Sequence, residues 1–134
     1  MYNMEPTIIL GSIDITALHK AATKLTAILH EPKNEFIRDA AIQRFEFTYE
    51  LVWKTMKRIL AVKGLVINNP RDVFREAAKQ GIIDGLDVWF LYIEYRNQTT
   101  HVYNESVAEE LYSKLPVFNT MVQSFLTTCS QMSK

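Results

Sequence analysis

WFLYIEYRNQTTHVY is the sequence of residues 89–103. Its first half is apolar and aromatic, as in a helix with almost no polar face. The second half then changes abruptly to side chains with chemical functions, namely Arg96, Asn97, Gln98, Thr99, Thr100, His101 and Tyr103. This density of polar groups directly extends a segment that should be buried. The stretch therefore predicts a core helix that ends in a candidate functional site.

Arg96 continues an apolar stripe of this helix. Leu86, Trp89, Ile93 and Arg96 follow one another at spacings of three, four and three residues, which places them on one helical face. A guanidinium keeps its charge, and burying it unpaired is very costly. Arg96 must therefore reach a carboxylate, backbone carbonyls, water or an anionic ligand.

His101 comes five residues after Arg96. On a continuous helix their side chains would point about 140° apart. If both act on one substrate, either the helix bends near Thr99 or a second subunit completes the site. A purely structural alternative is also open. In it, Arg96 caps the C-terminus of its own helix, where cations are favoured, and His101 bonds Asn97 one turn before it.

Composition limits the class of protein. A chain of 134 residues predicts one domain, residues 1–134. Fifteen basic residues balance fifteen acidic ones, which argues against coating nucleic acid by global electrostatics but permits a local cationic site. No DNA partner is expected. Cys129 is the only cysteine, so no disulfide framework or thiolate metal cluster is expected. We expect no cofactor. With no leader-like start and no apolar run of membrane length, we expect a cytoplasmic protein without a membrane partner.

Sparse turns predict an all-α fold. Four glycines and four prolines leave few places for the turns that a β-rich fold needs. Residues 1–12 are expected to be irregular. The predicted helices run from Asp14 to His30, from Asn34 to Gly64, from Asn69-Pro70 to Gln80-Gly81, from near Asp84–Asp87 into the polar run, and from Asn104 or Ser106 to the C-terminus. The last of these is either one helix kinked before Pro116 or two nearly coaxial pieces.

The third of these helices is too short to span a bundle. We therefore predict an antiparallel up-and-down four-helix bundle with a short crossover helix. The last long segment carries an apolar stripe that includes Cys129, which we interpret as a core residue. Apolar surface that one bundle leaves uncovered suggests a homodimer.

A second candidate group lies on the long second helix. Glu46 and Glu50 are one turn apart and would repel on a bare helix, while Trp53 follows on the same face. Glu50 can pair with Lys54, which would explain it as a solvated residue. Alternatively, the carboxylates face a cleft in which they hold Arg96, orient a ligand or coordinate a metal. Trp53 would then supply a stacking wall.

Two motifs resemble a known family. Residues 96–103 match R-x-x-x-x-H-x-Y, and the upstream run FEFTYELVWK covers residues 45–54. Together they resemble the HEPN superfamily, and more closely its HepT-like members, also described as nucleotidyltransferase substrate-binding proteins. The resemblance covers nearly the whole chain. It implies a dimeric four-helix bundle that partners a minimal nucleotidyltransferase in a module of the toxin–antitoxin type.

The resemblance also implies roles for individual residues. Arg96 and His101 of two protomers would line one cleft and cut RNA without a metal, with Arg96 on the scissile phosphate and His101 as general acid or base. Asn97 would support them, and Tyr103 would be adenylylated by the transferase to silence the toxin. A non-catalytic subunit that binds a substrate or nucleotide for the transferase is the alternative, and a plain helical scaffold is a third.

Overall fold

Short polar caps and long apolar stripes produce a helical protein. The computed structural model describes residues 5–132. Its elements are β1 (Ile8–Ile9), β2 (Ile13–Asp14), α1 (Thr16–Leu29), α2 (Glu35–Val62), α3 (Pro70–Lys79), α4 (Leu86–Gln98), the 3₁₀ turn η1 (Thr99–His101) and α5 (Glu105–Ser130). The predicted all-α class is confirmed apart from the two short strands. None of the helices in this part of the chain is both long and apolar enough to cross a membrane.

Asparagine side chains begin three of the helices. Asn34 Oδ1 accepts a hydrogen bond from Ile37 N at 2.8 Å, and Asn69 Oδ1 accepts one from Asp72 N at 3.0 Å. Asn104 does the same for the start of α5, so of the two predicted caps it is Asn104 and not Ser106. Each bond satisfies a backbone N–H that the first helical turn leaves free. The predicted helix starts are confirmed at these positions.

The predicted irregular start is wrong for part of its length. Ile9 pairs with Ile13 in an antiparallel hairpin, and α1 begins at Thr16, later than the expected cap Asp14. The Asp14 carboxylate still accepts a hydrogen bond from Thr16 N at 2.9 Å. Strands of two residues are too short to produce a recognisable alternation of apolar and polar residues. Residues 1–4 of the predicted segment lie outside the described residues.

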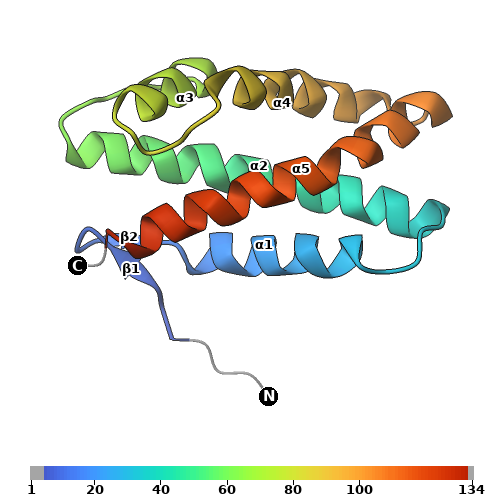
Figure 1. Cartoon of the computed structure of the whole chain (residues 1–134), viewed down its shortest axis with the longest axis horizontal. Helices are drawn as coiled ribbons and strands as arrows, with labels where there is room; N and C mark the ends of the chain where they lie inside the picture. Colours follow the sequence, from blue (N-terminus) through green and yellow to red (C-terminus); the bar gives the residue numbers. More distant parts are fainter. Residues whose placement is uncertain (1–4, 133–134) are drawn as a thin grey trace.

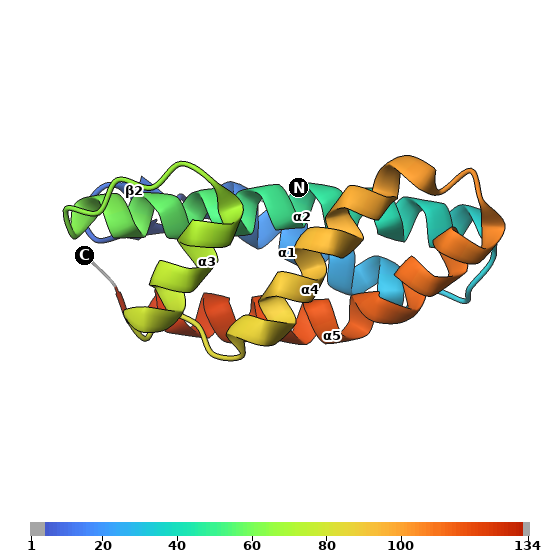
Figure 2. The ribbon, with the colours of Figure 1, turned by 90° about the horizontal axis from the view of Figure 1, so that it is seen from above.

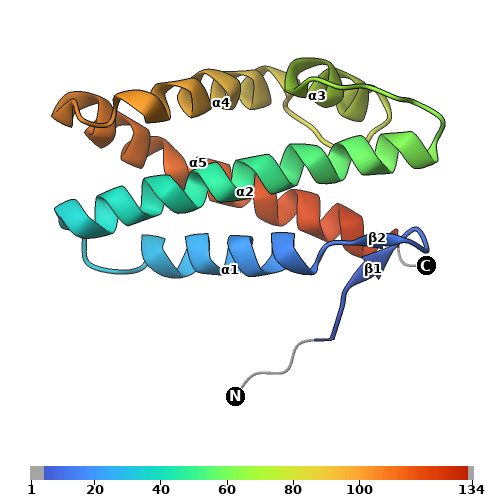
Figure 3. The ribbon, with the colours of Figure 1, turned by 180° about the vertical axis from the view of Figure 1, so that it is seen from behind.

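The helices form stacked layers, with α2 and α5 in the middle. In Figure 1, α1 lies below this pair and α3 and α4 lie above it. Figure 2, seen from above, shows α4 crossing over both central helices, and Figure 3 shows α2 in front of α5 from the opposite side. The chain runs in opposite directions in α1 and α2, and again in α4 and α5.

Aromatic side chains fill the space between these layers. Phe45 of α2 meets Phe118 of α5 edge to face, with ring centroids 4.8 Å apart, and Phe74 of α3 stacks on Trp89 of α4 at 5.2 Å. Edge-to-face and offset-stacked pairs add to the free energy gained from burial. Trp89 also meets Phe118 of α5 edge to face at 6.2 Å, so the core joins the outer pair α3 and α4 to the central pair.

Helix α5 passes through Pro116 as a single helix, one of the two predicted forms. The hydroxyl of Tyr92 on α4 donates a hydrogen bond to the Lys114 carbonyl at 2.6 Å, close to this proline. Burial raises the pKa of Tyr92 to about 12, so the hydroxyl stays a donor at physiological pH.

Cys129 is fully buried, and burial raises the pKa of its thiol to about 12. These properties agree with a core residue.

The aromatic helix is less buried than predicted. Within α4 only Trp89 and Tyr92 are buried, and Leu91 is 51% exposed. The other apolar residues of α4 are half-buried against the core. A single copy of the chain thus covers one face of α4 and leaves apolar groups on the other in contact with solvent.

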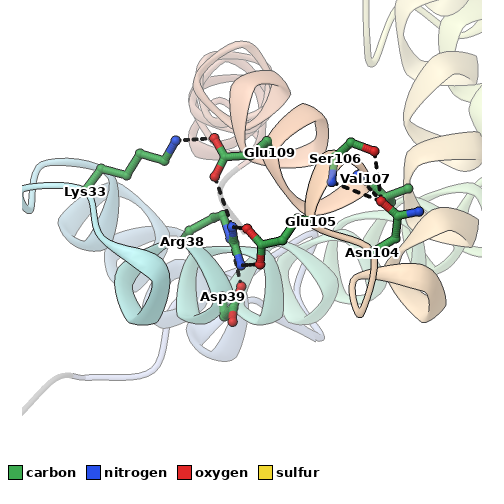
Figure 4. A network of polar contacts seen from close by, with 8 residues as sticks. All are labelled: Lys33, Arg38, Asp39, Asn104, Glu105, Ser106, Val107 and Glu109. Atoms are coloured by element: carbon green, nitrogen blue, oxygen red, sulfur yellow. Dashed lines mark hydrogen bonds and ion pairs between the residues drawn. The ribbon is translucent and has the colours of Figure 1, made fainter.

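A buried arginine joins the N-terminal ends of α2 and α5 (Figure 4). Arg38 is 3% exposed, and its two terminal nitrogens donate to the two carboxylate oxygens of Glu105 at 2.7 and 3.0 Å. It also donates to Glu109 at 3.0 Å and to Asp39 at 2.9 Å, while Lys33 pairs with Glu109. These bonds compensate for the loss of water around the buried guanidinium.

This cluster predicts a specific loss of stability in acid. Hydrogen bonds from Arg38 lower the pKa of Glu105 below its ordinary 4.5, and bonds from Lys33 and then Arg38 lower that of Glu109. Because the folded-state pKa values are the lower ones, the unfolded chain binds more protons as the pH falls through this range. The stabilisation of the fold by these ion pairs is therefore complete above pH 4.5. It is lost as the pH falls through the lowered pKa values of Glu105 and Glu109.

We expect Arg38→Met to lower the free energy of unfolding at pH 7, and its difference from the wild type to shrink as the pH falls below 4.5. Urea unfolding followed by circular dichroism at a series of pH values measures both. Arg44→Met is the matched control, because Arg44 also lies on α2 but bonds the Lys24 carbonyl and no carboxylate. A difference between Arg38→Met and wild type that does not change with pH would contradict the assignment.

Candidate functional site

Helix α4 changes its geometry at Thr99. The α-helix ends at Gln98 and continues as the 3₁₀ turn Thr99–His101, so the helix is not regular between Arg96 and His101. Thr99 is buried, and its hydroxyl oxygen lies 2.7 Å from the Arg96 carbonyl and 3.1 Å from Glu46 Oε2. The regular helix thus ends near Thr99, where a bend was one of the two expected ways for Arg96 and His101 to act on one substrate.

Arg96 extends from α4 to two carboxylates of α2. Its Nη1 lies 3.3 Å from Glu46 Oε2 and donates a hydrogen bond to Thr99 Oγ1 at 2.8 Å, while its Nε lies 3.7 Å from Glu50 Oε2. The side chain is 30% exposed. Arg96 does lie in the last turn of α4, as the interpretation of a cap on its own helix expects, but its charged group is paired with carboxylates of another helix. Of the open alternatives for Glu46 and Glu50, the one in which they hold Arg96 agrees with this geometry.

Two nitrogens of Arg96 lack a hydrogen-bond partner among residues 5–132. Nε is buried and makes no hydrogen bond, since 3.7 Å to Glu50 is too long for one. Nη2 makes none either and is not among the fully buried atoms. The guanidinium is thus fixed on one edge and free to donate on another, which suits an oxygen ligand that approaches from solvent.

Glu50 is shared between several neighbours. Trp53 Nε1 donates to its Oε1 at 3.3 Å, and Lys54 Nζ lies 3.7 Å from the same oxygen. The predicted pair of Glu50 with Lys54 is therefore present together with the contact to Arg96. Burial raises the pKa of neighbouring Tyr49 to about 12, and the negative charge of Glu50 contributes to that rise. The half-buried Trp53 indole is held at the edge of this cluster.

His101, the last residue of the turn, and Tyr103, two residues later, are exposed to solvent. The Nδ1 atom of His101 lies 3.2 Å from the Tyr103 hydroxyl, and Tyr103 is 82% exposed. The expected bond from His101 to Asn97 is wrong, because η1 is wound more tightly than an α-helix and carries His101 away from it. Asn97 is exposed, and its carbonyl accepts a hydrogen bond from Thr100.

The structure thus separates the predicted site residues into two groups. Arg96, Glu46, Glu50 and Trp53 form a partly buried charged cluster between α2 and α4, and His101 with Tyr103 forms an exposed pair on the adjoining turn. Among the described residues no hydrogen bond connects Arg96 to His101. Residues 5–132 also contain no cluster of three or more His, Cys, Asp or Glu side chains that could hold a metal ion.

Sequence analysis missed Arg38. It lies four residues before Ile42 and so extends the apolar stripe of α2 that continues with Phe45 and Tyr49. A charged residue in line with core residues is the same signal that identified Arg96. Its partners Glu105 and Glu109 are 67 and 71 residues away in the chain, so only the fold reveals them.

Comparison with known proteins reveals similar sequences. A family model described as nucleotidyltransferase substrate binding protein like matches residues 13–131. A Haemophilus influenzae protein named as a probable ribonuclease HepT is 36% identical over 83 residues, which is 58% of this chain and 57% of that protein. The aligned region therefore spans little more than half the length of that relative.

Solved structures share the fold. A crystal structure of a Thermus thermophilus protein aligns with a TM-score of 0.78 and 31% identity over 82% of this chain and 96% of that one. A second structure, from Haemophilus influenzae, is described as revealing the fold of a substrate-binding domain of a nucleotidyltransferase. It aligns with a TM-score of 0.78 and 26% identity over 87% of this chain and 99% of that one. Since the family match extends over most of its length, the chain belongs to the nucleotidyltransferase substrate-binding protein-like family.

Proposed function

We propose that this protein is the helical partner of a minimal nucleotidyltransferase and a metal-independent ribonuclease toxin of the HEPN type. The observation that carries the proposal is the turn after α4, where Arg96 leads into the exposed pair of His101 and Tyr103. The family match and the relative named as a probable ribonuclease support it. The proposed architecture is an antiparallel up-and-down bundle of α1, α2, α4 and α5 with α3 as the crossover, and the proposed setting is a cytoplasmic toxin–antitoxin-type module.

Metal-independent cleavage of RNA needs a base, an acid and a cation. An RNA 2′-hydroxyl attacks the adjacent phosphorus, the bond to the 5′-oxygen breaks, and a cyclic phosphate and a free 5′-hydroxyl result. His101 acts as the base that takes the 2′-hydroxyl proton or as the acid that protonates the leaving oxygen, since imidazole titrates near neutral pH. Arg96 donates from its free Nη2 to a phosphate oxygen and stabilises the developing charge, with Asn97 as a further polar group beside the site.

A second copy of the chain would complete this site. Arg96 is turned toward α2 while His101 points to solvent, so one copy does not direct both at a single phosphate. The partly exposed apolar groups of α4 provide surface that a dimer would cover. A symmetric dimer places two copies of His101 in one cleft, one as base and one as acid.

The first test is RNA cleavage. Protein expressed without the transferase is incubated with total RNA in EDTA, after its intact mass has been recorded. We expect cleavage by the wild type and a loss of about 10²- to 10⁴-fold in rate for His101→Ala, the usual range for a general acid or base. His19→Ala is the matched control, because His19 lies half-buried on α1, away from the turn. Unmodified wild-type protein that cleaves no RNA would contradict the ribonuclease proposal.

The second test is adenylylation of Tyr103. The phenolic oxygen would attack the α-phosphate of ATP in the cognate transferase, forming a phosphodiester and releasing pyrophosphate. We expect the mass of the wild type to rise by one or more AMP units, and that of Tyr103→Phe to stay constant. Tyr112→Phe should behave as wild type, since Tyr112 is half-buried beside Lys33 whereas Tyr103 is 82% exposed. Equal labelling of Tyr103→Phe and wild type would exclude this tyrosine.

A non-catalytic subunit that binds a nucleotide or another small anion for the transferase is the second candidate. The contact between Trp53 and Glu50 beside the partly free Arg96 favours it, because an indole and a guanidinium suit a base and a phosphate. Calorimetry with ATP should then give binding that Arg96→Ala weakens by about tenfold or more, in line with the loss of a charge-assisted bond. RNA cleavage that depends on His101 would exclude the non-catalytic role.

A further inference from the structure

The turn that carries His101 is attached to α2 at both ends. At its start, the hydroxyl oxygen of the buried Thr99 lies 3.1 Å from Glu46 of α2. After it, Glu105, the first residue of α5, is held by Arg38 of α2. Arg38 and Glu46 are eight residues apart, which is about 12 Å along the helix axis. Helix α2 therefore sets the positions of both ends of the turn.

Between these ends, Val102 packs against the core and the Thr100 hydroxyl bonds the Asn97 carbonyl at 3.2 Å, but the site side chains are less constrained. His101 and Tyr103 are exposed, and the only polar side-chain contact described for either is the one between them. The backbone contributes one bond across the turn, from Asn104 N to the His101 carbonyl at 3.0 Å. Asn104 also caps α5, one residue before Glu105. The direction of the imidazole thus depends in part on where the first turn of α5 is held.

Arg38 has the geometry to hold that turn in one register. Its planar guanidinium makes two parallel bonds to Glu105 and a third to Glu109, one turn further along α5 (Figure 4). Paired bonds of this kind define both distance and orientation, which a lysine cannot do. A buried ion pair often stabilises a protein no more than apolar residues of the same size would. Fixing a register is therefore the better physical account of this arginine.

We propose that Arg38 is a positioning residue that directs His101 and Tyr103 through its bonds to the first turn of α5. This inference rests on the proposed function where it concerns cleavage, but it also predicts the order of the turn independently of any activity. Loss of the bidentate contact leaves the α5 end of the turn with fewer constraints. Misplacement of a reacting group by about 1 Å can cost on the order of 10²-fold in rate.

The test compares Arg38→Lys, Glu105→Gln and the matched control Arg44→Met at a temperature where circular dichroism shows all of them folded. Arg44 bonds the Lys24 carbonyl at 2.9 Å and touches neither Glu105 nor the turn. With an RNA oligonucleotide, we expect kcat of Arg38→Lys to fall at least about tenfold with little change in KM, because the site is displaced rather than removed. Arg44→Met should keep the wild-type kcat.

Hydrogen exchange provides a readout that needs no catalysis. In Arg38→Lys and Glu105→Gln, the amides of residues 104–108 should exchange at least about tenfold faster, while those at the centre of α2 keep their protection. An unchanged exchange rate at residues 104–108 overturns the proposal, as does a loss that is equal throughout the protein. If the wild type cleaves no RNA, the proposed ribonuclease function fails while the exchange result still decides whether Arg38 orders the turn.

Discussion

A guanidinium that leaves water must be paired with negative charge, and helix α2 meets this requirement twice. Arg38 of α2 is surrounded by Glu105 and Glu109 of α5, and Arg96 of α4 lies against Glu46 and Glu50 of α2. Each pairing connects a core stripe of one helix to another helix. The apolar core determines that these helices pack, but such directional bonds determine the register in which they do so.

The two pairings differ in how completely they satisfy their arginine. Arg38 is 3% exposed, and each of its three guanidinium nitrogens donates at least one hydrogen bond. Arg96 is 30% exposed and has a buried Nε without a bond. Buried polar atoms without partners are rare in folded proteins and often occur where function requires them. The first arginine therefore suits a structural task and the second suits a ligand.

Features that depend on neighbouring residues could be predicted from the sequence. The caps Asn34, Asn69 and Asn104 and the core position of Cys129 follow from local rules and from the helical repeat. The need of Arg96 for a partner followed from its place in an apolar stripe. The choice of Glu46 and Glu50 among several possible partners did not follow from the sequence, since it depends on how α4 crosses α2. The bond expected between His101 and Asn97 assumed an unbroken α-helix, and the tighter turn at Thr99 removes that spacing.

The carboxylates beside Arg96 have a consequence for any anionic substrate. A phosphate that approaches Arg96 must share it with Glu46 and Glu50, and a chain with equal numbers of acidic and basic residues adds no general attraction. Such a site binds a phosphate less tightly than a free arginine on a basic surface would. Its advantage is preorganisation, because the side chain is already held by α2 and the cost of ordering it is met when the protein folds. In the proposed ribonuclease, selectivity would then come from the geometry of one turn and not from the overall charge of the surface.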